Sequence, residues 1–371
     1  RRPRMSKAAE LAALIGSQTA QTGRNIVING AQNVAQRGTS AVTIADAAQY
    51  RVDRFNAYDN TSGAFTYEQS TTTPSGEGFI NSTKLTVTSA DTSIAAGEYA
   101  YYAQYIEGTN FSQCDFGNSG AKSVTLSFFV RSSATGTYCV TLANSASNRS
   151  FVSEYTISSA NTWEKKTITV AGDTTGTWLT TTGIGLKVFF CLAVGSTYQQ
   201  SAGSWGTTSF AFGSSNQTNW LGTNGNTLYI TGVQLEIGDV ATPFEHEDFG
   251  TTLAKCQRYF ENITSENGSV ITIGQVYSSA TDAAGPLHYK VQKRAAPSVG
   301  MPTVGRNTNN INYLMATAGF VPTSDGTITA VYIGTQQCTL FGDNYNVFGA
   351  NGDASWLYSN GTNTFTIDAE L

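Results

Sequence analysis

Val124-Thr-Leu-Ser-Phe-Phe-Val130 decides the fold class of this chain. Apolar residues occupy every second position, which is the period of a strand buried on one face. Val188-Phe-Phe-Cys-Leu192 is apolar on both faces, as expected for a central strand of a sandwich. In residues 228–237 the apolar face shifts at Gly232, which indicates a β-bulge. Together these runs predict an all-β protein.

The rest of the chain predicts two β domains. Residues 25–247 contain short alternating strands between clusters of Gly, Asn, Ser and Thr. They show no fixed period, which favours a jelly-roll β-sandwich over a repeat array. Residues 248–371 open with a stretch, 251–260, that suits either a helical turn or a linker, and strands resume at Ser269. At roughly 100 residues, this part is the right size for a smaller C-terminal β-sandwich.

Residues 1–24 form a separate N-terminal segment, in which residues 6–19 predict a short helix. Leu11, Leu14 and Ile15 are spaced i, i+3, i+4 and therefore line one face of that helix. Because a helix this short is marginal in isolation, the apolar stripe needs a partner. Its own domain, a second copy of the chain and a neighbouring protein all remain open.

Charge limits the partners that can be expected. Only 13% of the 371 residues are charged, and the net charge is −5. Phosphate binding needs a basic face, and here Lys and Arg are scattered, so nucleic acid is not an expected partner. The basic cluster in residues 1–7 is interpreted as a solvated tail or a junction. Residues 8–15 are too few to span a bilayer, so no membrane insertion is expected.

The cysteines are odd in number and widely spaced, which suits buried free thiols better than a disulfide framework. They are Cys114, Cys139, Cys191, Cys256 and Cys338. This usage indicates synthesis in a reducing cytosol.

Catalytic motifs are missing from the sequence. His246 and His288 are the two histidines, and neither a GxSxG elbow nor an HExxH zinc motif occurs. Isolated acids in strand-like segments are usually solvated or paired, so they make a weak case for a glycanase. These acids are Glu98, Glu107, Glu154, Glu164 and Glu236. We expect a protein that is not an enzyme, and assign no catalytic residue and no cofactor.

Calcium is the metal for which the sequence offers suitable ligands. Jelly-roll domains often tie strand ends together with oxygen ligands, and Asn29, Glu236 and Asp239 carry the oxygen donors that this ion prefers. Spacing alone assigns no site, so a structural calcium ion stays open.

Aromatic residues in polar surroundings are the strongest signal for binding. Exposed rings can stack on the apolar faces of sugars, although a single Trp in a β-sandwich is more often part of the core. Residues 197–224 form a long polar loop that holds several aromatics, an arrangement that is costly unless it contacts something. The predicted glycan-binding residues are Tyr198, Trp205, Phe212 and Trp220.

Several stretches resemble tail-fibre-type virion proteins of marine bacteriophages, which carry a jelly roll similar to carbohydrate-binding modules. They include Asn25-Ile-Val-Ile-Asn-Gly30, Tyr50-Arg-Val-Asp-Arg-Phe55 and Thr231-Gly-Val-Gln-Leu-Glu-Ile-Gly238. The most specific are Ala241-Thr-Pro-Phe-Glu-His246, Cys256-Gln-Arg-Tyr-Phe260 and the ending Ile367-Asp-Ala-Glu-Leu371. In the 241–246 motif, Pro243 is expected to fix the exit direction and Phe244 to insert into the domain it leaves.

The resemblance implies a component exposed on the particle surface, commonly a homotrimer, that attaches to host surface polysaccharide. In this family a long N-terminal part docks to the tail, whereas only a short helix precedes this jelly roll. Either the parent chain is longer, or the helix is the docking element that contacts other virion proteins.

Two alternatives to a tail fibre or receptor-binding subunit remain. A capsid decoration or head-fibre protein is favoured by the short apolar helix and requires no glycan binding. A glycan depolymerase requires a pair of positioned carboxylates, which the sequence does not reveal.

Overall fold

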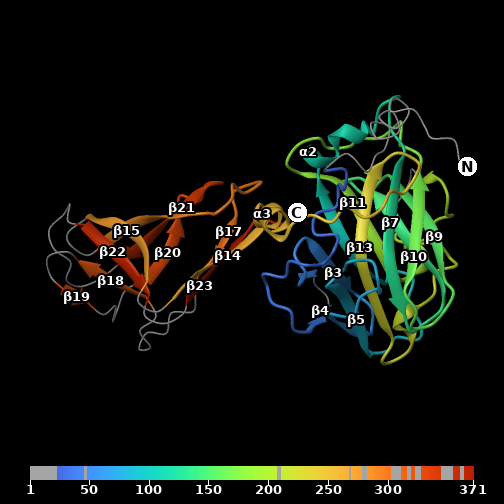
Figure 1. The fold of residues 1–371 in the computed structure, drawn as a ribbon, viewed down its shortest axis with the longest axis horizontal. Coiled ribbons are helices and arrows are strands. Elements are labelled where there is room, and N and C mark those ends of the chain that lie inside the picture. The colour runs from blue at the N-terminus through green and yellow to red at the C-terminus, as the bar shows by residue number, and fades with distance from the viewer. Residues whose placement is uncertain are drawn as a thin grey trace, which may run out of the picture. The chain divides into compact units, whose positions relative to one another are not determined.

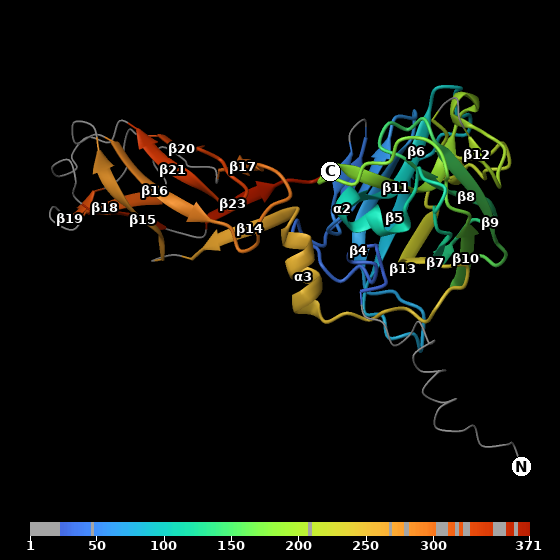
Figure 2. The same ribbon diagram turned by 90° about the horizontal axis from the view of Figure 1, so that it is seen from above.

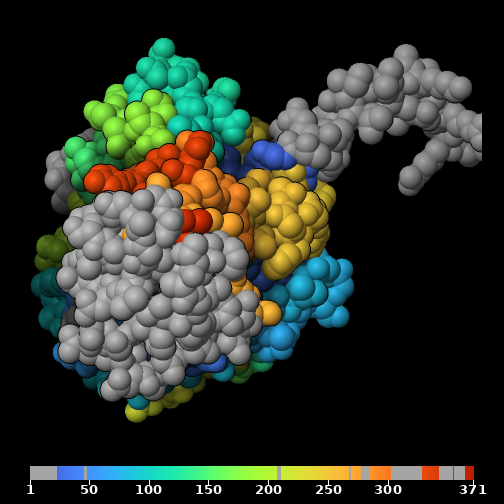
Figure 3. All heavy atoms as spheres, turned by 90° about the vertical axis from the view of Figure 1, so that its left-hand side faces the viewer, coloured from blue at the N-terminus to red at the C-terminus, as the bar shows by residue number. Residues whose placement is uncertain are grey.

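The computed structural model describes residues 23–45, 48–206, 210–266, 269–277, 282–301, 311–315, 319–321, 327–343, 354–359 and 363–371, which are coloured in Figure 3. The chain divides into two compact units, residues 1–252 with Leu371 and residues 253–370. The predicted domain boundary, between residues 247 and 248, lies slightly N-terminal to this division. The helix predicted over residues 6–19, with Leu11, Leu14 and Ile15, lies outside the described residues.

The first unit is a sandwich of two antiparallel sheets (Figure 1). Sheet A has the order β1 (Val42–Ile44), β4 (Ala64–Ser70), β5 (Ser82–Ser89), β13 (Thr227–Ile237), β7 (Val124–Ser132) and β10 (Glu164–Val170). Sheet B has the order β12 (Trp205–Gly206), β9 (Ser150–Ile157), β8 (Gly136–Ala143), β11 (Ile184–Val194), β6 (Tyr99–Glu107), β3 (Phe55–Asp59) and β2 (Gln49–Tyr50). Short helical turns link the strands: α2 (Gly108–Phe111), η2 (Ser112–Cys114), η3 (Ser196–Tyr198) and η4 (Trp220–Gly222).

The main core lies between these sheets and follows the alternation of the sequence. In β7 the side chains of Val124, Leu126, Phe128 and Val130 are buried in it. β11 is a central strand between β8 and β6, as its apolar character on both faces predicted. The predicted all-β jelly-roll sandwich is therefore confirmed.

The predicted bulge at Gly232 is also confirmed. The register between β13 and β7 shifts between Thr231 and Gln234, and Gly232 has a φ of +62°. A Cβ at Gly232 would lie 2.6 Å from the Phe79 ring and 2.9 Å from the Phe129 ring. The bulge thus requires glycine, because both rings approach the backbone there.

The second unit begins within α3 (Phe249–Gln257) and has two antiparallel sheets (Figure 2). The three-stranded sheet has the order β14 (Phe260–Ser265), β23 (Asn363–Asp368) and β17 (Ser298–Gly300). The larger sheet has the order β19 (Gly319–Val321), β18 (Ile311–Met315), β22 (Ala354–Ser359), β15 (Val270–Tyr277), β16 (Asp282–His288), β21 (Gln337–Asp343) and β20 (Thr327–Val331). Phe365 and Ile367 from the smaller sheet share one core with Val276 and Leu340 from the larger, so this unit is also a sandwich.

Two of the sequence motifs meet in the second unit. Phe260 is the register partner of Asp368, and the N–H of Ala369 donates to the carbonyl of Tyr259 at 2.7 Å. Lys293 and Glu261 form an ion pair at 3.0 Å with both side chains fully buried. Burial lowers the pKa of Lys293, and the nearby Glu261 carboxylate opposes that shift.

All five cysteines are buried and free, as predicted. No helix within the described residues is long and apolar enough to cross a membrane.

Candidate functional site

A cluster of aromatic side chains covers the outer face of sheet B. We call it the tyrosine face, and it consists of Tyr58, Tyr99, Tyr101, Tyr105, Phe189, Tyr198, Phe210 and Phe212. Its members come from β3, β6 and β11, which are neighbours in sheet B, and from the segment after β11. Five of them keep part of their surface in solvent: Tyr58, Tyr99, Tyr105, Tyr198 and Phe210.

Strand alternation in β6 builds the centre of the tyrosine face. In Tyr99-Ala-Tyr-Tyr-Ala-Gln-Tyr105, the tyrosines at odd positions belong to this outer cluster, whereas Tyr102 belongs to the main core. Tyr101 pairs with Tyr58 on β3 across the ladder. The span from Tyr99 to Tyr105 extends for about 20 Å along the sheet, which favours an extended ligand over a compact one.

The rings at the centre are held nearly parallel. The Tyr99 and Phe212 centroids lie 4.2 Å apart with planes inclined by 21°, and those of Tyr58 and Tyr99 lie 5.4 Å apart at 29°. Tyr101 stacks on Phe212 at 5.3 Å. The ring faces of Tyr58, Tyr99 and Phe212 thus cover one another in part, which favours contact with a ligand through their edges and hydroxyls. Ring edges carry the positive part of the aromatic quadrupole and so suit contact with oxygen atoms.

The hydroxyls of Tyr99, Tyr101 and Tyr105 stay protonated to high pH. Burial raises the pKa of Tyr99 to about 12, and the neighbouring Tyr58 contributes to that rise. Burial also raises the pKa values of Tyr101 and Tyr105, whose hydroxyl oxygens lie 3.1 Å apart. Each neutral hydroxyl can both donate and accept a hydrogen bond, as sugar hydroxyls do.

Lys187 borders the tyrosine face. It is the register partner of Tyr105, and its Nζ lies 5.9 Å from the ring centroids of Tyr105 and Phe210. Nζ donates to the Ser147 hydroxyl at 2.7 Å, and burial lowers the pKa of Lys187. The face is thus mostly uncharged and amphipathic, a surface that can bind a neutral polyhydroxyl chain through ring edges and hydroxyls.

The structure brings together two of the four residues predicted to bind glycan. Tyr198 and Phe212 both belong to the tyrosine face, but Phe212 is only 1% exposed and so supports the stack instead of contacting a ligand. The long polar loop is explained by this packing, because its aromatics cover sheet B.

The structure gives the two predicted tryptophans different surroundings, and only the prediction for Trp220 is wrong. Trp220 is fully buried and packs edge-on against Phe65 with centroids 5.7 Å apart, so no ligand reaches it. Trp205 packs on the main core against Phe151, and its Nε1–H donates to the carbonyl of Ala171 at 2.9 Å. Trp205 nevertheless keeps part of its surface in solvent, so its role in glycan binding stays a prediction.

Sequence reasoning missed Tyr58, Tyr99, Tyr101 and Tyr105. A signal for three of them was available, because the tyrosines of residues 99–105 recur with the period of a strand. Nothing in the sequence marked that face as the outer one, since the core face of β6 also carries a tyrosine.

Two of the three oxygen donors considered for calcium, Asn29 and Glu236, have other partners. Asn29 is buried, and its side-chain amide donates to the carbonyls of Val34 and Asp53. Glu236 is 1% exposed and accepts hydrogen bonds from the N–H and hydroxyl of Thr242. Within the described part of the chain, no three His, Cys, Asp or Glu side chains gather in a way that could hold a metal ion.

The isolated acids also accept hydrogen bonds from their own surroundings. Glu98 accepts from the Ala95 N–H, Glu107 from Thr109, Glu154 from Ser214 and Asn216, and Glu164 from Ser158, Ser159 and Lys166.

No family model and no curated protein matches the sequence. Among solved structures, the chain is similar to the enzymatically active domain of tailspike protein 4 of bacteriophage CBA120, with 14% identity and a TM-score of 0.34. That alignment covers 58% of this chain but only 22% of the tailspike chain.

Two further similar structures come from bacteria. One is a putative sugar-binding protein of Bacteroides thetaiotaomicron, with 13% sequence identity and a TM-score of 0.30. The alignment covers 58% of this chain and 100% of that chain. The other is a family 11 carbohydrate-binding module of Clostridium thermocellum in complex with a β-1,3-1,4-mixed-linked tetrasaccharide. Its sequence identity is 12% and its TM-score 0.29, and the alignment covers 55% of this chain and 99% of that chain.

Proposed function

We propose that this chain is an adhesive bacteriophage virion protein, a tail fibre or receptor-binding subunit, whose tyrosine face binds host surface polysaccharide without cleaving it. The proposal includes a homotrimer exposed on the particle surface and docked to other virion proteins through residues 1–24. It includes no catalytic residue and no cofactor.

The tyrosine face carries the binding part of this proposal. A half-exposed group of aromatic rings on the outer face of a sheet is costly to leave in water, and its ring edges and neutral hydroxyls match the oxygen-rich edges of sugars. Its extent along β6 favours a polymer chain. The face is better suited to a neutral glycan than to an acidic one, because its part-exposed side chains are uncharged and Lys187, at its border, already donates to the Ser147 hydroxyl at 2.7 Å.

The virion setting is supported by the sequence motifs. Phe244 of the most specific motif packs on Phe79 of the first unit, with ring centroids 4.9 Å apart, as its expected insertion requires. The motifs around Phe260 and at the chain end pair as neighbouring strands. Their resemblance to tail-fibre-type proteins thus involves residues with defined structural roles.

A binding experiment tests the proposal. The full chain is applied to an array of bacterial surface polysaccharides and to whole host cells, beside the double variant Tyr58→Ala, Tyr99→Ala. Because these rings and hydroxyls form the exposed part of the stack, we expect the variant to lose at least about tenfold in affinity, as for removal of two aromatic contacts.

Tyr229→Ala is the matched control, because Tyr229 is a half-buried tyrosine on sheet A, in contact with Arg131 and Trp163. The control should bind like the parent chain. Equal binding by the double variant, or no binding of the parent chain to any polysaccharide or host cell, would count against the proposal. Incubated polysaccharide should keep its chain length, since shortening would indicate a depolymerase.

A further inference from the structure

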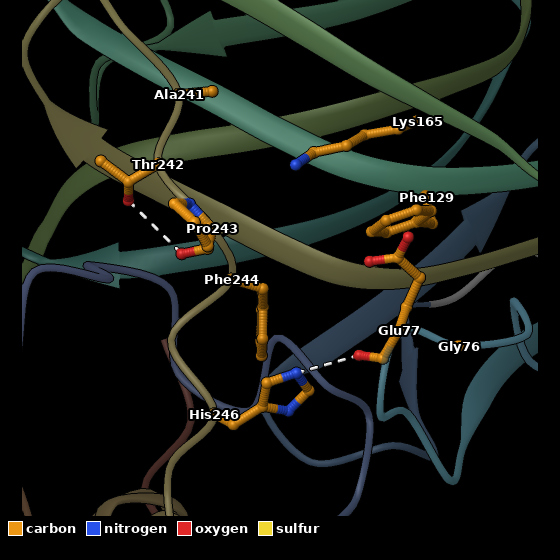
Figure 4. Close-up of a pocket in the computed structure, with 9 residues that line it drawn as sticks. All are labelled: Gly76, Glu77, Phe129, Lys165, Ala241, Thr242, Pro243, Phe244 and His246. Atoms are coloured by element: carbon orange, nitrogen blue, oxygen red, sulfur yellow. Dashed lines mark hydrogen bonds between the residues drawn. The ribbon is translucent and has the colours of Figure 1, made fainter. Parts of the chain in front are cut away.

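A second candidate site is a pocket in the first unit on the outer side of sheet A (Figure 4). It has a volume of about 380 Å³. Its walls are formed by Gly76, Glu77, Phe129, Lys165, Ala241, Thr242, Pro243, Phe244 and His246. One wall is formed by the Ala241–His246 motif, where the chain leaves the first unit, and we therefore call the site the hinge pocket. This motif has no part in the tyrosine face.

Aromatic rings form the floor of the hinge pocket. Phe79 packs against Phe129, Phe244 and His246, with centroids 5.5, 4.9 and 5.0 Å away. Gly232 makes this floor possible, because only a residue without Cβ leaves room for the rings of Phe79 and Phe129. Phe79 and Phe129 thus pack against the bulge, and Phe244 and His246 pack on Phe79.

The motif wall is fixed by a buried hydrogen-bond network. Glu236 accepts from the Thr242 N–H at 2.8 Å, and the Glu245 N–H donates to Gln234 at 2.8 Å. At its far end, His246 Nε2 lies 3.0 Å from the carbonyl oxygen of Glu77, which joins this wall to the loop that carries Glu77 (Figure 4). The pocket is therefore formed before any ligand enters.

Two opposite charges line the hinge pocket without pairing. Lys165 Nζ lies 5.7 Å from the Phe129 centroid, and neither Lys165 nor Glu77 has an ion pair among the described residues. By contrast, the adjacent Lys166 is paired with Glu164 at 2.6 Å. Figure 4 shows that Lys165 and Glu77 enter from different segments. One can therefore contact an anionic group while the other accepts hydrogen bonds from hydroxyls.

We propose that the hinge pocket binds one carboxylate-bearing sugar unit, a uronic acid. Lys165 binds the carboxylate, the Phe129 and Phe244 rings contact the apolar ring face, and Glu77 accepts hydrogen bonds from hydroxyls. The volume suits a single sugar unit with its water. This site lies on the opposite sheet from the tyrosine face and does not depend on the function proposed there.

The experiment uses the full chain with D-glucuronic and D-galacturonic acid as probes, and glucose and galactose as their neutral counterparts. Binding is measured by ligand-observed NMR titration. We expect at least one acid to bind about fivefold more tightly than its neutral counterpart, and Lys165→Gln to remove that difference, as expected for one partly exposed charge-assisted contact.

Three controls keep the result interpretable. Lys165 is exposed on the edge strand β10, so Lys165→Gln should leave the melting temperature unchanged. Lys166→Gln removes a neighbouring cation outside the pocket and should preserve the preference for acid.

The double variant Tyr58→Ala, Tyr99→Ala should also keep the preference for acid, which separates this site from the tyrosine face. The proposal is overturned if neither acid binds more tightly than its neutral counterpart, or if the preference survives Lys165→Gln.

Discussion

The two outer faces of the first sandwich are built in different ways. The tyrosine face on sheet B is largely uncharged, and its centre is made by strand alternation, with Tyr99, Tyr101 and Tyr105 on one side of β6. The hinge pocket on sheet A has a floor shaped by a bulge and walls made by loops, with Lys165 and Glu77 as opposite charges. On the two proposals made above, one surface binds an extended neutral ligand and the other a small charged unit.

Of the changes considered, Gly232→Ala should have the largest effect on stability, and it should affect the two outer faces unequally. The new Cβ would collide with the rings of Phe79 and Phe129 and force a positive φ on alanine. We expect the free energy of unfolding to fall by about 3 kcal/mol. Denaturant unfolding followed by tryptophan fluorescence measures it, because all tryptophans except Trp356 lie in the first unit.

Gly225→Ala is the matched control, since Gly225 has a φ of +80° and an added Cβ would meet nothing within 4 Å. It isolates the backbone strain and should cost about 1 kcal/mol. Equal losses in the two variants would mean that the ring contacts at Gly232 have no energetic weight. The polysaccharide affinity of folded Gly232→Ala should stay unchanged, whereas its hinge pocket should lose uronate binding.

The same comparison explains which parts were predictable from the sequence. The bulge at Gly232 and the insertion of Phe244 were predicted, because a phase shift at a glycine and a Pro-Phe junction are local signals. The centre of the tyrosine face depends on which side of β6 faces the main core. Tyr102 and Tyr101 are the same residue type, and only the packing of sheet A on sheet B distinguishes them.

The prediction for Trp220 failed for a related reason. Trp205 and Trp220 lie in polar, glycine-rich sequence, and local composition predicts exposure for both. Trp220 is nevertheless buried against Phe65, which lies far earlier in the chain. Long-range packing of this kind overrides the local pattern, and it also brings Lys165 and Glu77 to one pocket, which no local signal in the sequence indicated.

A pH titration sharpens the account of the tyrosine face. Tyr99 has a folded-state pKa of about 12 against an ordinary value of 10.0. A raised pKa contributes stability that is fully present below pH 10 and is lost as the pH rises toward 12, because the unfolded chain ionises first. We expect the free energy of unfolding of the first unit to be insensitive to this group below about pH 9 and to fall above pH 10, with polysaccharide binding lost in the same range.

Tyrosinate absorbance measures this directly in the folded and the denatured chain. The folded chain should titrate later than the denatured chain, and Tyr99→Phe should reduce the delayed fraction. Full ionisation of the folded chain near pH 10 would contradict the buried, coupled hydroxyls described for this face.

High salt should produce the smallest change in ligand affinity. It should also distinguish the two sites, because only one of them is expected to depend on charge. At roughly 1 M salt the Debye length is about 3 Å, which weakens the attraction between a partly exposed ammonium and a carboxylate. Uronate binding at the hinge pocket should therefore weaken by about two- to threefold, because it depends on the Lys165 charge. Binding of a neutral polysaccharide to the tyrosine face depends on rings and neutral hydroxyls and should change by less than about 1.5-fold. An equal loss of affinity at both sites in high salt would mean that the charge of Lys187 contributes to binding at the tyrosine face, as that of Lys165 does at the hinge pocket. Lys187→Gln would then abolish the salt dependence of polysaccharide binding.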